Sequence, residues 1–113
     1  MTEQMSGTDD LWARVRAAVA WFDATNGRDQ AEITLRILKI VEEAGEAAGA
    51  WIGALGQNPR KGHSHTVDDV AAELADVAFA TMVAIASLGV DVEATITACA
   101  RKVSQRIDDE PGE

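Results

Sequence analysis

Apolar residues recur every three or four positions along most of the chain, which is the spacing of one face of an α-helix. This pattern predicts four helices, over about residues 11–26, 28–55, 66–88 and 91–107. The breaks fall at Asn26-Gly27, in the polar loop from Gly56 to His65, and at Gly89, where the local residues end helices. We therefore expect an all-α fold, a four-to-five-helix bundle.

The same pattern sets the domain boundaries. Residues 9–107 are expected to form a single helical domain, between a disordered N-terminus (residues 1–8) and an acidic tail (residues 108–113). Thr66 and Asp69 have the spacing of a capping box that opens the third helix, and Asp91 is the expected N-cap of the fourth.

Two apolar surfaces stand out, one on the second predicted helix and one on the third. The second helix gathers one broad apolar face, made of Ile33, Ile37, Ile40, Val41, Ala44, Ala48 and Trp51. The third helix carries no charge on any side from Phe79 to Leu88, and a small subunit rarely buries such a helix completely. We interpret this half-helix as a subunit interface and expect a homodimer, or a homotetramer formed as a dimer of dimers.

Composition narrows the class of protein. A chain of 113 residues forms one domain that buries about two thirds of its unfolded surface. The net charge of −9 argues against a nucleic acid or an anionic membrane as partner. Cys99 is the single cysteine, so an intrachain disulfide is excluded, and the longest apolar run, Val77–Val90, is shorter than the roughly 20 residues of a membrane span. We expect a soluble, cytoplasmic protein.

Two carboxylate pairs carry the candidate chemistry. Glu43 and Glu46 lie three positions apart in the second predicted helix, as do Glu73 and Asp76 in the third, so two packed helices would bring four carboxylates together. Carboxylate oxygens suit a hard cation, Mg²⁺ with Mn²⁺ as a substitute, and such ions usually carry phosphate substrates. The alternative is the solvated face of a purely structural bundle.

These residues resemble a known family. Glu42-Glu43-Ala44-Gly45-Glu46 followed by Glu73-Leu74-Ala75-Asp76 is similar to the paired acidic motif of the MazG-like, all-α nucleotide pyrophosphohydrolases, which are related to dimeric dUTPases and dCTP pyrophosphatases. The resemblance covers about residues 30–106. It implies hydrolysis of a nucleoside triphosphate to the monophosphate and pyrophosphate, in house-cleaning of non-canonical or surplus nucleotides.

The resemblance also assigns roles to individual residues. It implies that Glu43, Glu46, Glu73 and Asp76 bind Mg²⁺, with Glu42 behind them or acting as the base for the attacking water. It places Lys102 against the triphosphate. Arg106 stands where the family often has an asparagine.

Further candidates come from the residues themselves. Lys39 and Arg36 lie on the flank of the second-helix carboxylates, where phosphate charge calls for a cation, although Arg36 is equally explained as a solvated side chain. Lys102 and Arg106 share a flank of the fourth helix. Trp21 or Trp51 is the most natural platform for a nucleobase, although each is more often core or interface. In the loop, Arg60 and Lys61 are weaker candidates for phosphate, and His63 and His65 for a metal.

Two rival functions remain. The first is phosphoribosyl-ATP pyrophosphatase, a related all-α hydrolase of histidine biosynthesis with acidic motifs of a similar kind. The second is a non-catalytic helical module that binds a nucleotide or a partner helix.

Overall fold

The computed structural model describes residues 7–111 and is all-α, as the pattern predicts. Its four helices are α1 (Gly7–Asn26), α2 (Gln30–Leu55), α3 (Val67–Ser87) and α4 (Val92–Asp109), and the described residues contain no strand. α1 begins inside the segment expected to be disordered, of which residues 1–6 lie outside the described part. α4 runs two residues into the expected acidic tail.

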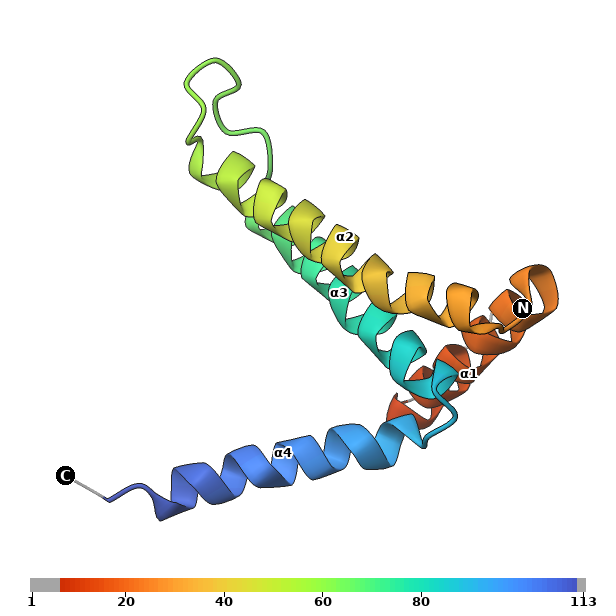
Figure 1. Ribbon diagram of the computed structural model, residues 1–113. Coiled ribbons are helices and arrows are strands. Elements are labelled where there is room, and N and C mark those ends of the chain that lie inside the picture. Colours follow the sequence, from red (N-terminus) through yellow and green to blue (C-terminus); the bar gives the residue numbers. More distant parts are fainter. Residues whose placement is uncertain (1–6, 112–113) are drawn as a thin grey trace.

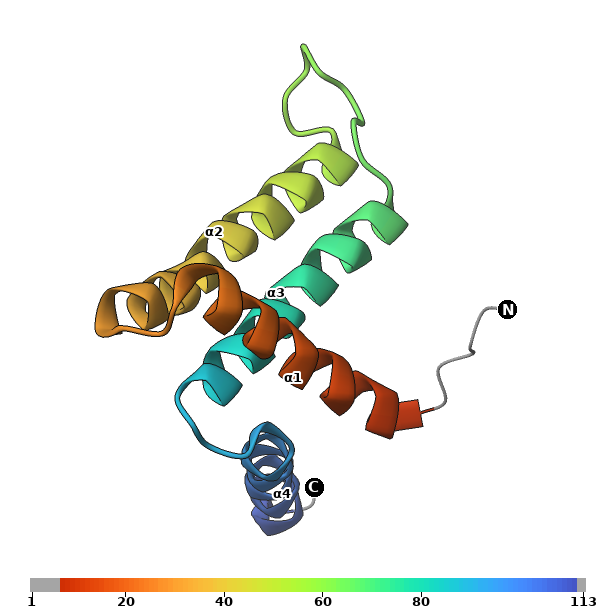
Figure 2. The ribbon, with the colours of Figure 1, turned by 90° about the vertical axis from the view of Figure 1, so that its right-hand side faces the viewer.

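The helices form an open arrangement around one antiparallel pair. α2 and α3 lie side by side along their lengths, α1 crosses one end of the pair, and α4 extends away from it (Figures 1 and 2). The radius of gyration is 17.7 Å, against about 13 Å for a compact domain of this length. The single chain is therefore less compact than a self-contained domain.

Helix ends follow local sequence signals. The Thr66 hydroxyl accepts a hydrogen bond from the Asp69 backbone N–H at 3.1 Å, and the Asp69 carboxylate accepts one from the Thr66 N–H at 2.9 Å, so the predicted capping box is confirmed. Asp91 caps α4 by accepting from the Ala94 N–H at 2.8 Å. Gly27 adopts a φ of +77° just after α1, a conformation that glycine takes at little cost.

Small residues line the contact between α2 and α3. Ala47 and Ala50 of α2 and Ala84 of α3 are each at most 5% exposed, and none of them holds the helices apart with a long side chain. Glu43 lies one helical turn from Ala47, and Glu73 lies three positions after the buried Val70, so both carboxylates stem from the surfaces that face the partner helix. The close packing of this pair sets the spacing of the candidate site.

The broad apolar face predicted for α2 is not the core of the single chain. Val41 is 70% exposed, and Ile37 and Trp51 are also exposed, because α3 packs along the neighbouring strip that contains Arg36, Ala47 and Ala50. By length and composition α3 could also cross a membrane, a weak indication because core helices of soluble proteins have the same composition.

The role of the second half of α3 as a subunit interface stays a prediction, but within the single chain this segment is already partly covered. α1 crosses it within the same chain, where Val15 of α1, Val83 of α3 and Val92 of α4 form the buried core. Periodicity could not reveal this, because it does not say which helix of the chain covers an apolar surface.

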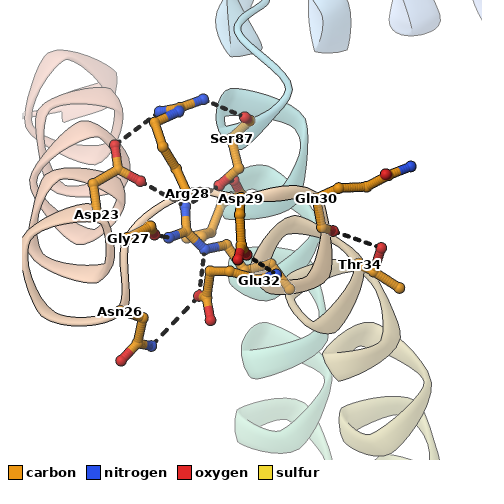
Figure 3. A network of polar contacts seen from close by, with 11 residues as sticks. Asp23, Asn26, Gly27, Arg28, Asp29, Gln30, Glu32, Thr34 and Ser87 are labelled. Carbon is orange, nitrogen blue, oxygen red and sulfur yellow. Dashed lines mark hydrogen bonds and ion pairs between the residues drawn. The ribbon is translucent and has the colours of Figure 1, made fainter.

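The buried side chain of Arg36 joins α1, α2 and α3. Figure 3 labels four of the residues that it contacts, Asp23, Gly27, Glu32 and Ser87. Arg36 is 5% exposed and donates through Nε to Glu32 at 2.8 Å, through Nη1 to Asp23 at 2.9 Å and Ser87 Oγ at 3.1 Å, and through Nη2 to the Gly27 carbonyl at 2.9 Å. It is neither a solvated cation nor a free phosphate ligand. Its hydrogen bonds fix how α1 crosses the pair.

Ion pairing stabilises the positive charge of the Arg36 guanidinium. Burial acts to lower the pKa of Arg36, but its hydrogen bonds to Glu32 and Asp23 outweigh burial and the pKa is raised. The guanidinium also lies over the Phe22 ring, 5.4 Å from its centroid. Arg28 donates to Asp23 at 2.8 Å and supplies a second positive charge.

We predict that Arg36→Met lowers the free energy of unfolding by about 3–5 kcal/mol, because it leaves the partly buried Glu32 without its cation and Asp23 with Arg28 alone. Urea denaturation at pH 7 measures this, and Arg101→Met, at an exposed position of α4, should change it by less than about 0.5 kcal/mol. The hydrogen bond from Arg36 chiefly lowers the pKa of Asp23. The contribution of ionised Asp23 to the free energy of unfolding is therefore fully present above its ordinary pKa of 3.8. It is lost as the pH falls below that value through the lowered pKa of the folded state. A loss as small as that of the control would contradict the structural role of Arg36.

Candidate active site

The structure brings the five predicted carboxylates together. Glu42, Glu43 and Glu46 come from α2, and Glu73 and Asp76 come from α3. They form two groups, Glu42 with Glu43 and Glu46, and Glu43 with Glu73 and Asp76, and within each group one carboxylate oxygen per residue lies within 4.8 Å of the others. Glu43 belongs to both groups, so the cluster is continuous across the two helices.

One atom of this cluster points to a missing partner. Glu73 Oε2 is buried and accepts no hydrogen bond. A buried carboxylate oxygen without a partner is costly, and native proteins rarely leave one unsatisfied. A cation between Glu43, Glu73 and Asp76 would satisfy it, and a donor set of carboxylate oxygens alone fits Mg²⁺ or Mn²⁺ better than a softer metal.

Lys39 supplies positive charge at one end of the cluster. Its Nζ lies 2.9 Å from Glu42 Oε1 and 3.3 Å from Glu43 Oε1, and these two hydrogen bonds raise the pKa of Lys39. At the other end, the negative charge of Glu43 is the largest cause of a raised pKa of Glu46, followed by burial and the charge of Glu73. The side of the cluster near Glu46 therefore holds uncompensated negative charge.

A groove of about 710 Å³ opens beside these carboxylates, on the side of the pair crossed by α1. Glu43, Asp76 and Lys39 line one part of it. The rest is lined mainly by apolar side chains, with a polar group contributed by α1 and the start of α2, and these lining residues are Phe22, Asn26, Glu32, Leu35, Arg36, Phe79, Ala80 and Val83. The volume is typical of a small-molecule site.

The other predicted substrate contacts lie elsewhere in the chain. Trp21 is 62% exposed and packs edge-on against Phe22, and Trp51 is exposed near the far end of α2; neither lines the groove. Lys102 and Arg106 are exposed on α4, which extends away from the α2–α3 pair (Figure 1). The single chain therefore does not bring these four residues to the carboxylates.

Sequence reasoning missed the part of the groove contributed by α1. The flank that holds Glu32, Lys39 and Glu43 is readable from helical spacing, but Phe22 and Asn26 reach it only because α1 crosses the pair. The sequence did contain an indication of this crossing. Asp23 and Glu32 are acidic residues on either side of the turn at Gly27, and both accept hydrogen bonds from Arg36.

Comparison with known proteins gives one family. Residues 9–103 match the sequence model of the phosphoribosyl-ATP pyrophosphohydrolase family, a span that includes all five carboxylates and most of the chain. No curated protein and no solved structure matches. The matched family is the one named above as the first rival function. Its fold is related to that of the MazG-like proteins, and both are pyrophosphohydrolases. The chain belongs to the phosphoribosyl-ATP pyrophosphohydrolase family.

Proposed function

We propose that the protein is a Mg²⁺-dependent pyrophosphohydrolase that cleaves the bond between the α- and β-phosphates of a nucleoside triphosphate. The observation that carries the proposal is the carboxylate cluster on α2 and α3, which includes the buried, unsatisfied Glu73 Oε2. The family match supports pyrophosphohydrolysis and favours phosphoribosyl-ATP as the substrate. Surplus or non-canonical nucleoside triphosphates, expected from the MazG-like resemblance, are the second substrate class.

The residues divide into a metal-binding and a proton-accepting part. Glu43, Glu46, Glu73 and Asp76 would hold Mg²⁺, which supplies neutralisation of the phosphate oxygens. Glu42 is exposed at the edge of the cluster and would take the proton of the attacking water. Attack at the α-phosphorus then releases pyrophosphate. Lys39, which reaches Glu42 and Glu43, would pair with a phosphate oxygen in the groove.

A second copy of the chain is the proposed partner. The exposed face of α2 with Ile37, Val41 and Trp51 is unpartnered in the single chain, and the radius of gyration exceeds that of a compact domain. A lipid bilayer around α3 is a poorer alternative, because the acidic side chains of Glu73 and Asp76 lie near the middle of that helix. The proposed assembly is a homodimer, or a homotetramer of two such dimers, in the cytoplasm.

The same assembly accounts for the cations of α4. This helix extends away from its own groove and carries exposed Val103 and Ile107 beside Lys102 and Arg106. An apolar stripe of this kind packs against another helix. We propose that α4 packs on the partner and brings Lys102 and Arg106 to the phosphates in the partner's groove.

We predict metal-dependent pyrophosphate release. Phosphoribosyl-ATP and a panel of standard and modified nucleoside triphosphates are assayed with Mg²⁺, with Mn²⁺ and with chelator. Glu46→Gln and Glu73→Gln should each lower kcat/KM by about 100-fold, as even the outer partners of metal ligands can. Glu93→Gln, an exposed glutamate of α4, is the matched control and should keep the wild-type rate. Absence of release from every compound in both metals would overturn the proposed function.

We predict that Glu46→Gln stabilises the metal-free protein at neutral pH. The folded state raises the pKa of Glu46, so ionised Glu46 destabilises the fold as the pH rises above its ordinary value of 4.5. In chelator, the melting temperature of the variant should exceed that of the wild type at pH 7, and the difference should vanish near pH 4. Adding Mg²⁺ should then raise the wild-type melting temperature more than that of the variant. Equal shifts would contradict a role of Glu46 in binding the metal.

We predict that Val41→Glu converts the assembly to a monomer. Val41 is largely exposed in the single chain, so the new charge costs little there, but at an apolar subunit interface it would be buried without a partner. Analytical ultracentrifugation of the wild type should give a dimer or tetramer. Ala17→Glu, at an exposed position of α1, is the control and should leave the mass unchanged. A monomeric wild type would refute the second copy.

A further inference from the structure

The groove extends beyond the carboxylates into a part that no phosphate would fill. Its apolar and aromatic walls come from Phe22 of α1, Leu35 of α2 and, one helical turn from Asp76, Phe79 of α3. Glu32 and Glu43 line the same groove and lie 11 positions apart on α2, which corresponds to about 16 Å along the helix. An extended nucleotide is of this order of length, so a substrate with its phosphates at Glu43 and Asp76 places its base near Glu32.

The polar group at that end is fixed in place. Glu32 Oε2 accepts from Arg36 Nε at 2.8 Å and from the Asn26 side-chain amide at 3.4 Å (Figure 3). Its backbone N–H donates to the cap residue Asp29 at 2.9 Å. Because Arg36 is itself buried and held by α1 and α3, the carboxylate has little freedom to turn away from the groove.

The chemistry of this pair distinguishes among bases. An ionised carboxylate only accepts hydrogen bonds, whereas the neighbouring Asn26 amide can also donate. Adenine presents an amino donor at N6 beside the acceptors N1 and N7, and cytosine presents N4 beside the acceptor N3. At the corresponding positions hypoxanthine and uracil carry a carbonyl oxygen, which offers a carboxylate no proton. Their donor on this edge is the adjoining ring N–H, so a carboxylate held at the exocyclic position loses its hydrogen bond.

We propose that Glu32 and Asn26 read the exocyclic amino group of the base, and so make the groove selective for adenine- or cytosine-type nucleotides over their carbonyl-bearing counterparts. The proposal rests on the proposed function, which places the phosphates at the carboxylates. Phosphoribosyl-ATP keeps an exocyclic nitrogen at the adenine C6 position and is therefore compatible with this selectivity. Arg36 acts as a positioning residue, since it orients Glu32 and does not itself need to touch the base.

Matched nucleotide pairs test the proposal. ATP and ITP differ at C6 by an amino group against a carbonyl oxygen, and CTP and UTP differ in the same way at C4. We expect kcat/KM of the wild type to favour ATP over ITP and CTP over UTP by roughly 10- to 100-fold, the range for a hydrogen bond to a charged group. Glu32→Gln, which can also donate, should bring both ratios close to 1 while pyrophosphate release continues.

Asn26→Ala gives a second variant at an exposed position, should Glu32→Gln fold poorly. It should reduce both ratios, and Glu93→Gln should leave them as in the wild type. Release at equal rates from the members of each pair by the wild type, or unchanged ratios in Glu32→Gln, would overturn the selectivity and leave the proposed function standing.

A binding measurement separates the two failures. Titration calorimetry with the products AMP and IMP needs no turnover. If no triphosphate is hydrolysed, the proposed function fails, and the groove is judged by binding alone. Tighter binding of AMP than of IMP, lost in Glu32→Gln, supports base reading by Glu32. Equal binding of the two, or none, overturns it.

Discussion

Close packing of α2 against α3 is the constraint on which the candidate site depends. Ala47, Ala50 and Ala84 let the two helices approach without long side chains between them. Glu43 and Glu73 stem from the facing surfaces, so the approach that buries alanines also brings carboxylates together and leaves Glu73 Oε2 without a hydrogen bond. The carboxylates of the cluster repel one another, but the packing of α2 against α3 outside the cluster offsets this cost and holds the helices in place.

Arg36 performs the complementary task at the other end of the pair. It joins the Asp23 and Glu32 carboxylates, a backbone carbonyl of the α1–α2 turn and Ser87 of α3. By fixing where α1 crosses, it adds Phe22 and Asn26 to a groove that otherwise would have only two walls. One side of the pair thus carries an acidic end and mainly apolar walls.

The opposite surfaces of the single chain leave apolar side chains uncovered. The apolar face of α2 and the extended α4 expose side chains that a compact domain would bury, among them Val41 and Ile107. The family match concerns a pyrophosphohydrolase, whose substrate carries several negative charges, yet Lys39 is the cation nearest the carboxylate cluster in the described chain. A second copy that brings in Lys102 and Arg106 would supply both the missing burial and the missing charge.

The sequence alone determined the local features of the protein. The four helices, the capping box at Thr66 and the two acidic pairs each follow from residues within a few positions of each other. Which surface of each helix is covered is a long-range property. The apolar face of α2 reads as core but lies largely exposed, and the segment from Phe79 to Leu88, which reads as an interface, is partly covered by α1 within the single chain. The burial of Arg36 and the groove at Phe22 likewise exist only once α1 crosses α3. Tertiary structure decided these points, because periodicity identifies an apolar surface without identifying the surface that packs on it.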